Sequence, residues 1–133
     1  MKKVERKPQK RESGKNVLIV DDNAAVRKML ADAFLSDGFK TCSEAGNGSE
    51  GVEIAKQLKP DLIILDLAMP VMNGLQAAPV LRKLFPRTRI ILFTLYAASL
   101  LEAEASKAGV NLVLQKTDSL STLIKKAHEL MGD

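Results

Sequence analysis

Short apolar segments alternate with longer amphipathic segments along the chain from residue 16 onward. The short segments predict β-strands at residues 16–21, 39–45, 62–66, 89–94 and 110–115. The segment at 62–66 is almost wholly apolar, which is typical of a central parallel strand covered on both faces. The segment at 39–45 is more polar, which favours a position at the edge of the sheet.

The longer segments have apolar residues at helical spacing. In the first of them, Val26, Met29, Leu30, Ala33 and Phe34 fall on one face of a helix. The same spacing predicts helices at residues 23–37, 47–59, 75–85, 97–107 and 119–131. Side chains that can cap these helices stand near their starts, and the sequence leaves open Asp22 or Asn23, Asn47 or Ser49, and Ser119 or Ser121.

Strands that alternate with helices predict a parallel sheet built from βα units. Right-handed crossovers place the helices on both faces of the sheet. The expected fold is therefore an α/β domain, a doubly wound (βα)5 with strand order 2-1-3-4-5. A chain of 133 residues fits one such domain, which we place at residues 16–133.

Charge separates the first 15 residues from the rest. They hold seven basic and two acidic side chains, a net charge of +5, so that the remainder of the chain carries −1. With few apolar residues, the segment 1–15 is expected to be a disordered basic tail. The near-neutral remainder has no basic footprint for nucleic acid.

The remaining composition bears on the compartment. Cys42 is the single cysteine, so no disulfide is expected within the chain, and a reducing compartment such as the cytoplasm is favoured. No apolar stretch approaches the roughly 18 to 20 residues that a membrane span needs. The positively charged start is not followed by the apolar core of a secretory signal.

Reactive polar residues stand at the ends of four predicted strands. Asp21 ends the first strand and Asp22 follows it, Asp66 ends the third, Thr94 ends the fourth, and Lys116 follows the fifth. The carboxyl ends of parallel strands share one edge, and ligands of open α/β sheets bind in the crevice there. We therefore expect these five side chains to meet in one crevice.

Three carboxylates in one crevice would raise one another's pKa, and a divalent cation relieves that repulsion. Oxygen ligands with room for water suit Mg²⁺, with Mn²⁺ as the alternative. Lys116 and Thr94 would then surround Asp66 with positive charge and a hydroxyl donor. A carboxylate in such surroundings can attack phosphorus and carry a phosphoryl group as an acyl phosphate.

These residues and their order resemble the receiver domain of two-component response regulators, a family with a flavodoxin-like (βα)5 fold. The resemblance covers about residues 16–131. The stretches that carry it are Val17 to Asp22, Pro60 to Asp66 with Met69-Pro70 and Asn73-Gly74, Ile90 to Thr94, and Ala108-Gly109 leading to Lys116.

By this resemblance Asp66 is the phosphoacceptor, and Lys116 and Thr94 contact the phosphoryl oxygens. The implied metal ligands are Asp21, Asp22, Asp66 and the backbone carbonyl of Ala68. Such a domain is not an enzyme for an external substrate, because it catalyses only its own phosphorylation and dephosphorylation.

The resemblance also implies partners. The phosphoryl donor would be a phosphohistidine on a histidine kinase or a phosphotransfer protein. The output would be a downstream protein or an effector domain outside this sequence, and a phosphorylation-dependent homodimer is a further expectation. We expect this domain to make no direct contact with nucleic acid and none with a membrane.

The region around Lys116 departs from the common pattern of the family. Val113 stands three residues before the lysine, where many receivers carry Tyr or Phe, so a switch by rotation of an aromatic ring is not expected there. Thr117 and Asp118 follow the lysine in place of the common proline. That sequence is similar to receivers of the subfamily that carries helix-turn-helix effectors.

Two other positions bear on the lifetime of a phosphoryl group. Ala68 stands two residues after Asp66 and has no polar side chain with which to orient a water. Tyr96 stands two residues after Thr94, where its ring can shield an acyl phosphate and can also substitute for the missing switch ring. We therefore expect self-dephosphorylation that is not unusually fast.

Two surface features are also predicted from sequence. Leu100 and Leu101 lie together on the predicted fourth helix and form a candidate partner or dimer surface. His128 lies among Lys125, Lys126 and Glu129 and is expected to be a solvated residue on a polar face.

Three alternative functions share features with this sequence. Haloacid-dehalogenase-like phosphatases also use an aspartate nucleophile and magnesium, but their Asp-x-Asp motif follows the first strand, whereas Asp21 and Asp22 are adjacent. A degenerate receiver that binds proteins without phosphorylation would lack part of the site, and all five residues are present. An N-terminal receiver fragment of a DNA-binding transcriptional regulator remains open.

Overall fold

The computed structural model describes residues 14–132, so that most of the predicted tail at 1–15 lies outside the described residues. The strands are β1 (Asn16–Val20), β2 (Thr41–Ala45), β3 (Leu62–Leu65), β4 (Arg89–Thr94) and β5 (Leu112–Gln115). The helices are α1 (Ala24–Ser36), α2 (Gly48–Leu58), α3 (Gly74–Leu84), α4 (Ala98–Lys107) and α5 (Leu120–Met131). The strands form one parallel sheet of order β2-β1-β3-β4-β5, which confirms the predicted flavodoxin-like (βα)5 architecture.

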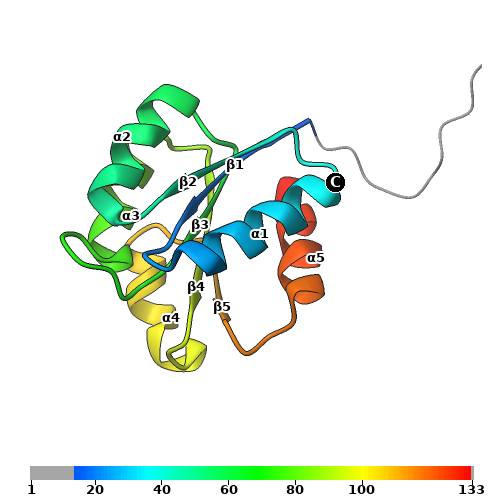
Figure 1. Cartoon of the computed structure of the whole chain (residues 1–133). Helices are drawn as coiled ribbons and strands as arrows, with labels where there is room; N and C mark the ends of the chain where they lie inside the picture. The colour runs from blue at the N-terminus through cyan, green and yellow to red at the C-terminus, as the bar shows by residue number, and fades with distance from the viewer. Residues whose placement is uncertain (1–13, 133) are drawn as a thin grey trace, which may run out of the picture.

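The helices cover both faces of the sheet (Figure 1), with α1 and α5 on one side and α2, α3 and α4 on the other. Alternate residues of each strand point to opposite faces, so the sheet has an apolar core on each side. On the α1 and α5 side, Leu30, Phe34 and Leu123 pack against the strands. On the opposite side, Ala77 and Leu81 of α3 are among the packed residues.

The position of each strand in the sheet follows its apolar content, as predicted from the sequence. All four residues of β3 are buried, because this strand lies at the centre of the sheet with helices on both faces. β2 is an edge strand, and only Ala45 of its five residues is buried. β2 and β5 begin at Thr41 and Leu112, each two residues later than predicted.

Side-chain caps fix where the helices near the carboxyl edge begin. Asn23, Asn47, Asn73 and Ser119 each accept a hydrogen bond from a backbone amide in the first turn of the following helix. The structure thus selects Asn23, Asn47 and Ser119 from the alternatives that the sequence left open. The βα loops before α1, α2, α3 and α5 are thus anchored at the helix that follows them, whereas Ala97 before α4 makes no side-chain cap.

The predicted solvent exposure of His128 is wrong. Only 3% of the residue is exposed, and its Nε2 lies 2.5 Å from Oδ2 of Asp37 at the end of α1. The ring also lies 5.2 Å from the ring of Phe39, between centroids. The prediction rested on the charged neighbours of His128 in the sequence. His128 instead lies on the same face of α5 as Ile124, one turn earlier, where α5 packs against α1.

None of the helices in residues 14–132 has the length and apolar character that crossing a membrane requires.

Candidate functional site

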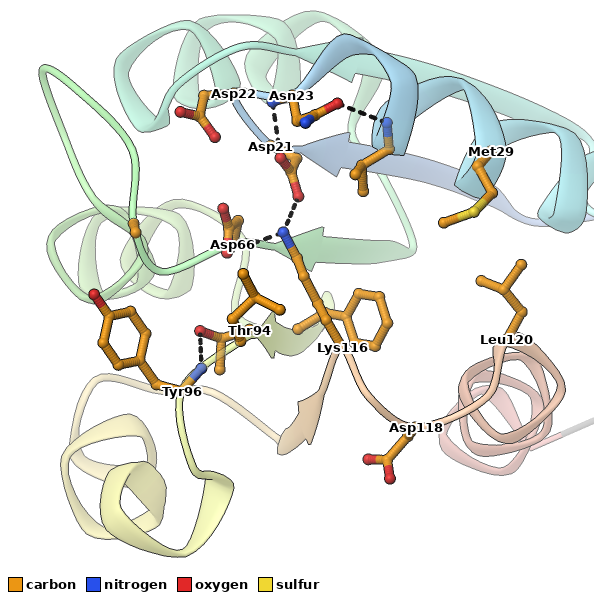
Figure 2. A pocket seen from close by; sticks show the side chains of 14 residues that line it. Asp21, Asp22, Asn23, Met29, Asp66, Thr94, Tyr96, Lys116, Asp118 and Leu120 are labelled. Carbon is orange, nitrogen blue, oxygen red and sulfur yellow. Dashed lines mark hydrogen bonds and ion pairs between the residues drawn. The ribbon is translucent and has the colours of Figure 1, made fainter.

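An open pocket of about 810 Å³ lies at the carboxyl ends of the central strands. Asp21, Asp22, Asp66, Thr94 and Lys116 all line it, and Figure 2 shows their side chains converging from β1, β3, β4 and the segment after β5. The structure therefore brings together all five polar side chains that the sequence placed at strand ends. Ala68, the sixth predicted site residue, also lines this pocket.

Three carboxylates form the acidic part of the pocket. One oxygen from each of Asp21, Asp22 and Asp66 lies within 4.8 Å of the other two. Asp21 and Asp66 are buried, whereas Asp22 is exposed. The cluster therefore has two carboxylates fixed in the protein and one that faces water.

Backbone contacts hold the two buried carboxylates in place. The amide of Asp21 donates to the carbonyl of Ala45 at 3.0 Å, and the amide of Asp66 donates to the carbonyl of Val20 at 2.8 Å. These bonds extend the parallel ladder beyond β1 and β3. Oδ1 of Asp21 accepts from the amide of Asn23 at 2.9 Å, and Oδ1 of Asp66 accepts from the amide of Leu67, also at 2.9 Å.

Lys116 places its ammonium group between the two buried carboxylates. Its Nζ lies 2.6 Å from Oδ2 of Asp21 and 3.4 Å from Oδ1 of Asp66. Burial alone would lower the pKa of Lys116, but the hydrogen bond to Asp21 and the two negative charges outweigh burial and raise the pKa. The ammonium is therefore charged throughout the neutral range.

Asp66 has a pKa raised to about 6. Burial is the main cause, and the negative charge of Asp21 adds to it, while the Lys116 ammonium and the amide of Leu67 act in the opposite direction. The carboxylate of Asp66 is thus ionised at neutral pH at a cost in stability. Any cation that binds beside it would reduce that cost.

Thr94 is fully buried at the end of β4, and its Oγ1 accepts a hydrogen bond from the amide of Tyr96 at 3.2 Å. This bond ties the hydroxyl to the loop that leads to α4 (Figure 2). Tyr96 itself is 56% exposed and its ring lines the mouth of the pocket. A movement of Thr94 toward Asp66 would therefore alter the contact that holds this loop.

Val113 occupies the β5 position where many receivers have an aromatic ring. It is half-buried and packs against the core on the α4 side of the sheet. No ring at this position can exchange between a buried and an exposed orientation.

The donor set of the pocket fits a small divalent cation. Asp21, Asp22 and Asp66 supply carboxylate oxygens, which Mg²⁺ and Mn²⁺ prefer, and the exposure of Asp22 leaves room for the waters that Mg²⁺ retains. Burial and the negative charge of Asp21 raise the pKa of Asp66, and a bound cation would offset both effects. The residues present therefore fit a magnesium site.

The apolar part of the pocket was not predicted from sequence. Val26 and Met29 of α1, Phe93 of β4 and Leu120 of α5 line the pocket beside the carboxylates. Met29 is 46% exposed although the helical pattern assigned it to the core. The signal that could have identified it is its spacing of three residues from Val26, which places both side chains on one face of α1.

Comparison with known proteins was made by sequence and by structure. Residues 17–128 match the family described as the response regulator receiver domain. The chain is 38% identical over 117 residues to the chemotaxis protein CheY of Thermotoga maritima, which covers 88% of this chain and 98% of that protein. It is also 34% identical over 110 residues to the transcriptional regulatory protein LnrK of Bacillus subtilis. That match covers 82% of this chain and 50% of LnrK, so the chain spans about half the length of this relative.

Solved structures agree with these matches. Chemotaxis protein CheY4 of Vibrio cholerae superposes with a TM-score of 0.81 at 27% identity, covering 87% of this chain and 98% of that one. A CheX–CheY–BeF3–Mg²⁺ complex from Borrelia burgdorferi contains a chain that superposes with a TM-score of 0.81 at 26% identity, covering 86% of this chain and 87% of that one.

Proposed function

The chain belongs to the response regulator receiver domain family, and on that premise we propose that Asp66 is the residue that accepts the phosphoryl group. The observation that carries this proposal is the position of the Asp66 carboxylate, which lies beside the Lys116 ammonium and two further carboxylates in one pocket. Such a domain is a phosphoacceptor rather than an enzyme for an external substrate. The family match accordingly disfavours the phosphatase alternative.

The proposed transfer balances as a substitution at phosphorus. An Asp66 oxygen forms an O–P bond while the P–N bond of a phosphohistidine breaks, and the leaving imidazole nitrogen keeps the electron pair and takes up a proton. Lys116 faces the oxygens that carry the transferred charge, and Thr94 can donate its hydroxyl proton to one of them. The product is an acyl phosphate on Asp66.

We assign the cation site to Asp21, Asp22, Asp66 and the backbone carbonyl of Ala68. Mg²⁺ bound there would neutralise negative charge on the carboxylates and on the phosphoryl group, and Mn²⁺ would serve the same role. The exposed carboxylate of Asp22 is the ligand best placed to share the ion with solvent.

The proposed donor is a histidine kinase or a phosphotransfer protein, in the cytoplasm. The cytoplasm is supported by Cys42, a free cysteine and the single one in the sequence. Burial raises the pKa of its thiol to about 12, so the thiol is unreactive at neutral pH.

The proposed output surface includes the loop after β4 and the start of α4. Leu95, Tyr96 and Leu100 are exposed there by 72%, 56% and 81%, and the loop is tied to Thr94. Leu101 packs partly against the core and contributes less than the sequence suggested. The occupant would be a downstream protein, a second phosphorylated copy, or an effector domain of a longer regulator, as the match to half of LnrK allows.

Incubation of the protein with acetyl phosphate and Mg²⁺ is expected to add one phosphoryl group, which mass spectrometry of the tryptic peptides should place on Asp66. The Asp66→Asn variant should remain unlabelled because its amide is not a nucleophile. Beryllofluoride should bind the wild type and not the variant.

Asp32→Asn is the matched control, because Asp32 is an exposed aspartate of α1 that forms an ion pair with Lys28 across one helical turn. It should label like the wild type. A wild-type protein that takes up neither label in the presence of Mg²⁺ would instead support the degenerate receiver, which binds partners without phosphorylation.

Phosphate label on Asp66 is expected to decay slowly in the isolated protein. Ala68 offers no side-chain donor to an attacking water, and Tyr96 stands at the pocket mouth. The measurement is the loss of label with time after the donor is removed, with Mg²⁺ present. Complete loss within seconds, without a phosphatase, would contradict this expectation.

A further inference from the structure

Arg27 in the first half of α1 is tied to the acidic cluster through the backbone. Its Nη1 donates to the carbonyl oxygen of Asp21 at 2.7 Å, and its Nε donates to Oε1 of Glu44 on β2 at 3.2 Å. The side chain is 20% exposed. The guanidinium therefore joins the end of β1 to its neighbouring strand.

The bond to Asp21 closes a small network around the β1–α1 turn. The amide of Arg27 donates to the carbonyl of Asn23 at 3.0 Å, and the amide of Asn23 donates to Oδ1 of Asp21 at 2.9 Å. Because β2 ends at Ala45, the guanidinium takes the place that a strand amide would have beside the Asp21 carbonyl. The backbone of Asp21 is thus fixed by Arg27 of α1, and its side chain by Asn23, the N-cap residue of the same helix.

We propose that Arg27 is a positioning residue for the cation site, which holds the turn so that the carboxylates of Asp21 and Asp22 converge with Asp66. This inference rests on the proposed magnesium site. The Arg27 guanidinium bonds to the Asp21 carbonyl and to Glu44, so it leaves the carboxylate oxygens of the cluster to Lys116 and the metal. Groups that orient metal ligands in this way typically contribute 10- to 100-fold to metal affinity.

Electrostatics alone predicts the opposite change in Mg²⁺ affinity, so the direction of the change on removal of Arg27 tests the inference. A positive charge near an acidic cluster repels a divalent cation, so removal of Arg27 should tighten Mg²⁺ binding if charge alone matters. If positioning dominates, removal should weaken it. Glu44 offsets part of the Arg27 charge, which allows the guanidinium to orient Asp21 with less repulsion of the metal.

The test compares R27M, R27K and E44Q with the wild type in the full chain. Isothermal titration calorimetry gives the Kd for Mg²⁺ at low and high NaCl, and urea unfolding without metal gives the stability of each variant. We expect R27M to raise the Kd roughly tenfold. R27K, which keeps the charge and can make one of the two bonds, should fall between R27M and the wild type.

E44Q is the matched control, because it removes the ion pair and leaves the bond from Arg27 to the Asp21 carbonyl. Its effect on the Kd should be small and should vanish at high NaCl, since salt screens the lost charge. The NMR signal of the Asn23 amide, which bonds to Asp21, should shift in R27M and stay in place in E44Q.

An R27M variant that binds Mg²⁺ as tightly as the wild type, or more tightly, would overturn the inference, even if that variant were less stable. A wild-type protein that binds no Mg²⁺ would overturn both the inference and the proposed metal site. Wild-type binding together with unchanged R27M affinity would leave the metal site intact and remove only the role of Arg27.

Discussion

Replacement of Lys116 by methionine is expected to lower the free energy of unfolding of the metal-free protein by about 3 to 5 kcal/mol at neutral pH. The ammonium lies 2.6 Å from Asp21 and 3.4 Å from Asp66, and its side chain is only 14% exposed. Without it, the two buried carboxylates keep the hydrogen bonds from the backbone amides of Asn23 and Leu67 but lose the positive charge beside them. Removal of one partner from a buried ionic group leaves the other charges uncompensated.

Urea unfolding in the presence of a chelator measures this loss, and Mg²⁺ should restore part of it, because a bound cation replaces the missing charge. Lys116→Arg keeps the charge and serves as the matched control, with a smaller loss from changed geometry. A methionine variant within about 1 kcal/mol of the wild type without metal would show that the ammonium does not stabilise the cluster.

Replacement of Asp66 by asparagine should have the opposite effect and raise the free energy of unfolding of the metal-free protein by about 3 kcal/mol above neutral pH. The pKa of Asp66 is raised from its ordinary 3.8 to about 6, so the folded state binds the proton more tightly than the unfolded state. The stability that this proton provides is fully present below pH 3.8 and is lost as the pH rises through about 6. Asparagine cannot ionise, so the variant avoids that loss.

The pH profile is therefore the decisive measurement. The difference in unfolding free energy between D66N and the wild type should be near zero at the acidic end, grow between about pH 4 and 6, and level off above that range. Mg²⁺ should narrow the difference by stabilising the wild type more than the variant. A difference that does not change with pH, or a variant less stable than the wild type at neutral pH, would contradict the claim that burial and repulsion destabilise the ionised carboxylate of Asp66.

The two substitutions lie in one cluster, so their effects should not add. The loss caused by K116M should be smaller in the D66N background, because one of the two stranded carboxylates is then neutral. The remaining loss would measure the shorter contact between Lys116 and Asp21.

The fold could be predicted closely from the sequence, because the spacing of apolar residues that distinguishes strands from helices is a local property of the chain. Five apolar segments and five amphipathic ones predicted every strand and helix, and the polar character of residues 39–45 placed β2 at the edge. Element boundaries shifted by one or two residues where turns, rather than periodicity, decide the start of a strand. The choice of Asn47 over Ser49 as a cap likewise depended on backbone geometry that no pattern of apolar residues records.

For the candidate site, the sequence by itself determined which side chains stand at the carboxyl edge, because parallel strands end there together and each polar residue follows its own strand. Only the tertiary structure decided how these side chains pair. Lys116 lies closer to Asp21 than to Asp66, Arg27 bonds to the Asp21 carbonyl, and His128 is buried against Asp37. Three of these contacts join segments far apart in the chain: Lys116–Asp21, Lys116–Asp66 and His128–Asp37. Their distances and burial arise from the packing of helices on the sheet, which a one-dimensional pattern does not contain.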